Sequence, residues 1–174
     1  MKYAWLSIGL ALVGLAMPVG AQPETLQRLK NGRECVNCNL QGADLRGLNL
    51  IGVNLTGANL QGARFGTEDK DLNRTALSRA NLSNANLQGA DLRNTSLDRA
   101  NLTGANLTGA NLAGASLIGA NLTGANLQGA NLTGAVLVNT NLSNANLTGA
   151  LMPRAFIAEV IYQSTRWVDG SLRN

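Results

Sequence analysis

Two cysteines in a Cys-Val-Asn-Cys segment, Cys35 and Cys38, are the residues of this 174-residue sequence whose spacing is most suggestive of chemistry. The spacing is compatible with a redox dithiol, with half of a metal site, or with a local disulfide. A zinc site normally has four ligands, and the chain offers no His and no third Cys. Because the segment leads directly into a repeat and not into a helix beside a βαβ unit, we predict a structural disulfide. A thiol–disulfide redox protein that uses Cys35 and Cys38 is the alternative.

Two groups of charged residues could bind ions. Glu68, Asp69 and Asp71 offer the oxygen ligands that Ca²⁺ prefers, but their spacing does not match an EF-hand and Lys70 interrupts them. We therefore predict a solvated acidic loop. A second group contains residues of both signs, which predicts a salt-bridged surface and not an anion site; it comprises Arg74, Arg79, Arg93, Arg99, Asp71, Asp91 and Asp98.

The sequence favours a protein without catalytic function, cofactor or metal. The absence of His removes the commonest general base and the commonest metal ligand. The many glycines are not followed by the Lys-Ser or Lys-Thr pair of a phosphate-binding loop. No nucleophile and base stand in a recognisable arrangement.

The elements that position these residues follow from a five-residue register, in which every fifth residue from Leu72 to Leu147 is Leu. A helix would rotate successive leucines by ~140°, and a straight strand would send them to opposite faces. A bend in each pentad keeps Leu and the Ala two residues before it pointing inward. Exceptions to the Asn or Asp that precedes Leu recur at twenty-residue intervals, which predicts four sides per coil: Ala76, Ser96, Ser116, Val136 and Phe156. Columns such as Asn81, Asn101, Asn121 and Asn141 are then expected to stack as amide ladders.

Pentads such as Ala100-Asn101-Leu102-Thr103-Gly104 resemble those of pentapeptide-repeat proteins. The resemblance covers residues 39–172 and implies an all-β, right-handed quadrilateral β-helix of about seven coils. We place a two-residue bulge within 66–71, between Phe65 and Leu72, and an irregular last coil at 152–172. Some members of the family mimic the shape and acidic surface of DNA and bind topoisomerases. This chain has a net charge of +4, so a nucleic-acid-mimicking inhibitor is a weaker alternative.

The N-terminal region carries an export signal and a cap. Residues 1–21 combine Lys2, a short apolar run and small residues before Ala21, which predicts a signal peptide cleaved after Ala21. The apolar run is shorter than the roughly 20 residues that span a bilayer. We expect no integral membrane segment after cleavage, and a location in the periplasm or the thylakoid lumen. The export signal with the Cys-x-x-Cys opening resembles cyanobacterial members. Residues 22–38 are predicted to form an N-terminal cap with a short helix.

One side of the predicted coil carries apolar residues where the other sides carry Asn, Thr, Ser or Gln. These residues, Ile118, Val136, Val138 and Phe156, are expected to form one apolar column. Exposed contiguous apolar surface is typical of a contact site. The alternative is burial beneath the C-terminal segment, 158–174. The predicted function is an exported, non-catalytic interaction module with an unknown protein partner or self-association, and without nucleic-acid binding.

Overall fold

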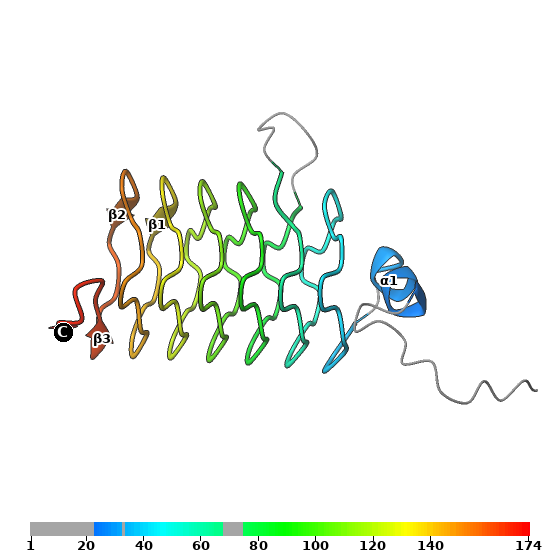
Figure 1. The fold of residues 1–174 in the computed structure, drawn as a ribbon, viewed down its shortest axis with the longest axis horizontal. Helices are drawn as coiled ribbons and strands as arrows, with labels where there is room; N and C mark the ends of the chain where they lie inside the picture. The colour runs from blue at the N-terminus through cyan, green and yellow to red at the C-terminus, as the bar shows by residue number, and fades with distance from the viewer. Residues whose placement is uncertain (1–22, 33, 68–74) are drawn as a thin grey trace, which may run out of the picture.

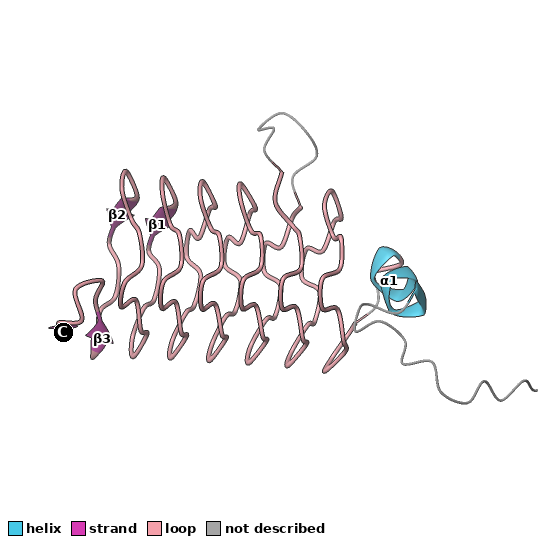
Figure 2. Cartoon of the chain, viewed as in Figure 1, coloured by secondary structure: helices cyan, strands magenta, loops and turns pink. Residues whose placement is uncertain are grey.

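The computed structural model describes residues 23–32, 34–67 and 75–174, in which a short helix lies at one end of a single stack of coils (Figure 1). Parallel bridges join residues twenty positions apart, as between Asn81 and Asn101 and between Asn101 and Asn121. Twenty residues in five-residue sides give the four-sided coil that the sequence predicts. Most of each coil consists of turns and single bridges, so little of it is drawn as strand (Figure 2).

The regular elements are few and short. The helix α1 spans Pro23–Lys30. The strands β1, Val136–Val138, and β2, Phe156–Ala158, pair in parallel on one side of the stack. The strands β3, Thr165–Arg166, and β4, Leu172–Arg173, pair antiparallel near the C-terminus. The helix α1 and the C-terminus lie at opposite ends of the stack (Figure 1).

Backbone hydrogen bonds hold neighbouring coils together. The amide of Leu102 donates to the carbonyl of Asn121 at 2.7 Å, and the amide of Asn101 donates to the carbonyl of Ala80 at 2.9 Å. The chain turns each corner two residues after the central Leu, with a left-handed backbone such as φ 67° at Gly104. A Cβ at Gly104 would approach Oδ1 of Asn84 to 2.5 Å, so conformation and space both favour glycine there.

The interior is filled by the Leu and Ala of each pentad. Leu102, Leu122 and Ala105 are fully buried, and each buried Leu contributes roughly 1.5–3 kcal/mol of transfer free energy. Thr replaces Ala at a few inward positions and is satisfied by main-chain carbonyls. Thr140, for example, donates through Oγ1 to the carbonyl of Leu117 at 2.9 Å. The core therefore tolerates a hydroxyl where a backbone acceptor lies within reach.

The predicted amide ladder is formed only in part. Asn101 donates through Nδ2 to Oδ1 of Asn81 at 3.1 Å. No corresponding bond links the described side chains of Asn101, Asn121 and Asn141, although their backbones are bridged. The Oδ1 atom of Asn121 instead accepts from the amide and hydroxyl of Thr123, at 3.1 and 2.6 Å. The main role of these Asn side chains is thus to stabilise the turn that follows them.

The prediction of a two-residue bulge is wrong. Asn49 is bridged to Ala76, 27 residues later, so seven residues are added to a regular coil between them. Leu72, which the register treated as a repeat centre, lies outside the described residues. Thr75 resumes the inward pattern and donates through Oγ1 to the carbonyl of Phe65 at 2.6 Å. Leu72 lies five residues before Leu77, so a count of leucine spacing alone cannot tell where the insertion ends.

The two ends of the stack are closed differently. Leu29 of α1 is buried and belongs to the hydrophobic core cluster. At the other end Trp167 is buried, with its ring 5.3 Å from that of Tyr162. Leu172 keeps the five-residue spacing at the end of the predicted irregular last coil, but it does not point inward, because β4 pairs back onto β3 and leaves Leu172 63% exposed. The predicted signal peptide, with Ala21, lies outside the described residues.

Candidate functional site

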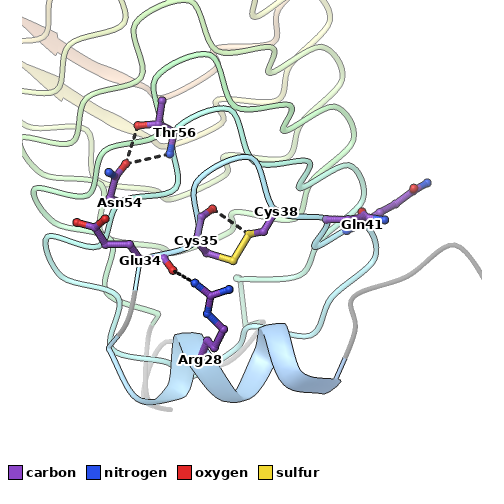
Figure 3. Close-up of a disulfide and its surroundings, with 8 residues drawn as sticks. Arg28, Glu34, Cys35, Cys38, Gln41, Asn54 and Thr56 are labelled. Carbon is purple, nitrogen blue, oxygen red and sulfur yellow. Dashed lines mark hydrogen bonds between the residues drawn. A yellow bond between two sulfur atoms is a disulfide. The ribbon is translucent and has the colours of Figure 1, made fainter. Parts of the chain in front are cut away.

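The cysteine pair lies where α1 meets the coil stack (Figure 3). Cys35 and Cys38 are joined by a disulfide, with their Cα atoms 5.4 Å apart. The amide of Cys35 donates to the carbonyl of Asn54 at 2.8 Å, so the disulfide is attached to the first coil. Arg28 of α1 donates to the carbonyl of Glu34 at 3.5 Å, next to the pair. Cys35 is only 2% exposed, which fits a structural link better than a reactive thiol.

No metal site is present in the part of the chain that the structure describes. No cluster of three or more Cys, Asp or Glu side chains there is arranged to hold an ion. The acidic group of Glu68, Asp69 and Asp71 lies outside the described residues.

The structure places the predicted apolar column on one side of the stack, and we call Ile118, Val136, Val138 and Phe156 the apolar face. The pairing of β1 with β2 sets Val136 beside Phe156. The bridge between Ser116 and Val136 places Ile118 on the preceding coil of the same side. Ile118 is 41% exposed and Phe156 is 62% exposed, whereas the two valines are half-buried. The C-terminal segment therefore leaves both ends of the apolar face open to solvent.

A cleft of about 410 Å³ continues the same side toward the N-terminus, and we call it the arginine cleft. Arg79 and Arg99 occupy equivalent corners of adjacent coils and are both exposed. Ile118 ends the cleft on one side, so the cleft and the apolar face share this residue. The complete lining is Ile51, Ser78, Arg79, Asp98, Arg99 and Ile118.

The prediction of a salt-bridged surface is wrong for the two cleft arginines. Among the described residues, neither Arg79 nor Arg99 forms an ion pair. Asp98 is held by other groups, since its Oδ1 accepts from the hydroxyl of Ser116 and from the amide of Ile118 at 3.2 Å. The hydroxyls of Ser78 and Ser96 bond to each other at 2.8 Å. The cleft thus holds two unpaired guanidinium groups and one carboxylate.

The ion pairs lie on a neighbouring side. Arg93 contacts Asp91 at 2.7 Å, as the mixed charges predict, and its hydrogen bonds lower the pKa of that carboxyl. Asp44 is contacted by Arg46 at 2.6 Å and by Arg64 at 2.7 Å. Hydrogen bonding by Arg46 is the main reason that the pKa of Asp44 falls well below its ordinary range. Arg46, Arg64 and Arg93 are therefore engaged in ion pairs, unlike Arg79 and Arg99 among the described residues.

Ile51 and Ser78 are cleft residues that sequence reasoning missed. The amide of Gly52 donates to the carbonyl of Ser78 at 2.9 Å, which places Ile51 on the coil next to Arg79. The assumption of a two-residue bulge assigns Leu50 to the column of Leu72 and moves Ile51 away from Ser78. With an insertion of seven residues, Ile51 and Ser78 take equivalent positions on adjacent coils. The signal that could have revealed it is the return of a small inward residue at Thr75.

The arrangement of coils, corners and inward Leu is shared with known proteins. A family model for pentapeptide repeats matches residues 34–66, 75–114 and 115–152, in eight copies. This chain belongs to the pentapeptide-repeat family. The fold is accordingly a right-handed quadrilateral β-helix, and most proteins of the family are not enzymes. A search of curated proteins found no match.

Two solved structures show the extent of the likeness. A pentapeptide-repeat protein, Rfr23, from the cyanobacterium Cyanothece 51142 is 38% identical, with a TM-score of 0.59. That alignment covers 79% of this chain and 92% of Rfr23. A trypsin-treated form of QnrB1, a plasmid-mediated fluoroquinolone resistance protein, is 26% identical with a TM-score of 0.67. Here 74% of this chain and 62% of QnrB1 are covered.

None of the helices in the described residues has the length and hydrophobicity needed to cross a membrane.

Proposed function

We propose that this pentapeptide-repeat protein is an exported, non-catalytic module that binds a protein partner through its apolar face. The exposure of Phe156 and Ile118, at positions where the other sides of the stack mostly carry polar residues, carries the proposal. Exposed contiguous apolar surface on a soluble domain tends to be a contact site. The rigid coil stack would present that surface without a folding transition, so little ordering entropy is lost on binding.

Export is supported by the signal-like residues 1–21 and by the disulfide between Cys35 and Cys38. Disulfides persist in oxidising compartments and are rare in the cytosol. The proposed location is the periplasm or the thylakoid lumen. Fractionation of source cells, with the N-terminus of the purified protein determined by mass spectrometry, tests this part. Cleavage after Ala21 is expected, and an intact Met1 in the cytosolic fraction would contradict it.

The two alternatives receive less support. A redox protein needs an accessible thiolate, whereas Cys35 is buried. A DNA-mimicking inhibitor needs an acidic surface, whereas the chain has 14 basic and 10 acidic residues. The likeness to QnrB1 bears on the fold and does not supply that acidic surface.

The binding proposal is tested by affinity capture from source cells with three purified forms of the protein. The first is wild type. The second carries Val138→Lys and Phe156→Lys, which place charges on the apolar face. The third carries Gln88→Lys and Gln128→Lys, which add the same charges to exposed positions on the opposite side. Circular dichroism verifies that all three are folded.

We expect the same protein to be captured by wild type and by the Gln88→Lys/Gln128→Lys control, and lost with the Val138→Lys/Phe156→Lys variant. Self-association is measured separately by analytical ultracentrifugation of the same forms. Equal capture by all three forms, or none by any, would contradict the proposal.

A further inference from the structure

The arginine cleft carries a local excess of positive charge. Two guanidinium groups lie on adjacent coils without an ion pair among the described residues. The one carboxylate of the cleft, Asp98, accepts bonds from Ser116 and from the amide of Ile118. The lining consequently carries a net charge of +1, contributed by Arg79, Arg99 and Asp98.

Both arginines stand where the backbone disfavours them. Arg79 and Arg99 have φ angles of 60° and 57°, in the left-handed region that Gly occupies at most corners of this stack. A residue with a Cβ is disfavoured in that conformation, because the Cβ comes close to the following carbonyl oxygen. The following corner of the same column is Gly119, and Cγ of Arg99 lies 3.4 Å from the position of a Cβ there. Other non-glycine residues, such as Asn84 and Arg154, share this conformation, so it is the position of two arginines at neighbouring corners of one cleft that points to a role for their side chains.

The cleft has a length that matches an extended peptide. Ile51, Ser78, Asp98 and Ile118 occupy one position on four successive coils. At ~4.8 Å per coil, Ile51 and Ile118 are about 14 Å apart. An extended chain rises ~3.4 Å per residue and points alternate side chains the same way, so residues four apart on one face also span about 14 Å. The residue midway between them would lie over the two arginines.

We propose that the arginine cleft binds an extended acidic segment of the protein partner, with a carboxylate between two apolar side chains on alternate residues. The guanidinium groups of Arg79 and Arg99 donate to the carboxylate, since charge-assisted hydrogen bonds of this kind are strong and directional. Ile51, which is 56% exposed, and Ile118 contact the flanking apolar side chains. The inference rests on the proposed function and names the chemistry of the partner.

The test is fluorescence anisotropy with a fluorescein-labelled peptide, Leu-Thr-Glu-Thr-Leu, whose three larger side chains share one face. The first control has Gln in place of Glu, and the second, Thr-Leu-Glu-Leu-Thr, moves the leucines to the other face. We expect the Glu peptide to bind at least about tenfold more tightly than the Gln peptide, as hydrogen bonds to charged groups predict. The difference should shrink as salt is raised.

The protein variant for this test is Arg79→Gly/Arg99→Gly, which removes both charges and suits the left-handed corners. Preference for Glu over Gln should vanish in this variant, while its circular dichroism stays that of wild type and its melting temperature does not fall. The proposal is overturned if wild type binds the Glu and Gln peptides equally, if it binds neither, or if the variant keeps the preference.

Affinity capture separates this inference from the proposed function, because Val138 and Phe156 lie outside the cleft. A partner lost with Val138→Lys/Phe156→Lys but kept with Arg79→Gly/Arg99→Gly overturns the cleft proposal and leaves the proposed function standing. Loss with both variants supports the two together.

Discussion

Two opposite sides of the same coils carry very different outward residues. On one side, which we call the amide face, Asn recurs before the central Leu at Asn59, Asn86, Asn106, Asn126 and Asn146. Its side chains are linked across coils, as where Asn106 donates to Asn86 at 3.3 Å and Asn146 donates to Asn126 at 3.4 Å. The opposite side has Ala76, Ser96 and Ser116 at the equivalent position, and then the apolar face.

The difference teaches which positions the fold requires. Leu117 under one side and Leu127 under the other are equally buried, so the core does not distinguish them. Outward residues on the amide face satisfy one another and the following turn. On the opposite side, the described residues form no ion pair with Arg79 or Arg99 and leave Ile118 and Phe156 exposed. Under the proposed function, the departures from the repeat that gain no internal partner mark the surface used for binding.

The largest loss of stability is expected from truncation of the buried leucines, where the two sides should be equal. Leu117→Ala and Leu127→Ala each remove a fully buried side chain, and each is expected to lower the free energy of unfolding by ~3 kcal/mol. Urea unfolding followed by circular dichroism measures both. Costs that differ by more than twofold would show that the core is not equivalent beneath the two sides.

A reciprocal exchange of the outward residue sharpens the comparison. Asn106→Ala removes an Oδ1 that accepts from the amide and the hydroxyl of Thr108, at 3.2 and 2.6 Å, and should cost about 1–2 kcal/mol. Ala76→Asn supplies the equivalent Oδ1 as an acceptor for the amide and hydroxyl of Ser78, and it should be neutral or stabilising by up to about 1 kcal/mol. The same unfolding experiment measures both changes, and equal destabilisation by the two would remove the proposed distinction between the sides.

Substitution of Arg99 at its left-handed corner is expected to change stability less, and in the opposite direction. Arg99→Gly relieves a left-handed residue and is expected to raise stability by about 0.5–1 kcal/mol, whereas Arg99→Lys keeps the strain and should change little. Gly109→Arg is the mirror control at a corner of φ 64° where a Cβ has open space, and it should cost about 1 kcal/mol. A loss of stability in Arg99→Gly would mean that the arginine side chain stabilises the fold.

The smallest effect concerns the ion pairs beside the cleft. The hydrogen bonds from Arg93 hold the pKa of Asp91 below that of an unfolded Asp, near 3.9. This contribution is present above about pH 4 and is lost as the pH falls toward the folded pKa. Asp91→Asn should therefore reduce the drop in the free energy of unfolding between neutral and acid pH. The reduction should be less than about 1 kcal/mol, because the pair is partly exposed. Arg99→Gln, which breaks no pair, should leave the profile unchanged, and thermal melts across pH 2–7 compare the two.

Sequence periodicity predicts the repeating part of this molecule well because every pentad repeats one local solution. Four sides, inward Leu and Ala, and the placement of Ile118 and Phe156 on one side follow from spacing alone. The turn residues follow from the need for a left-handed corner. The twenty-residue spacing also sets Arg79 and Arg99 on adjacent coils, but spacing does not predict that they form no ion pair among the described residues, because side-chain pairing across coils depends on direction as well as register.

The errors lie where the repeat is interrupted. Leu72 continues the five-residue count, so spacing alone predicts an insertion of two residues before Thr75, whereas the pairing of Asn49 with Ala76 requires seven. The position of Ile51 in the arginine cleft was lost as a consequence. Leu172 also keeps the count, but the pairing of β4 with β3 turns it outward. Spacing alone cannot separate a repeat centre from a Leu that shares its phase.

The most direct test of the account is site-specific photocrosslinking in source cells. p-Benzoylphenylalanine replaces Phe156 on the apolar face, and in a matched protein it replaces Gln128, an exposed residue of the opposite side. The account predicts one discrete crosslinked product from position 156 and none from position 128. Crosslinks that are absent at 156, or equally strong at both positions, would contradict the claim that this side of the coil stack binds a protein partner.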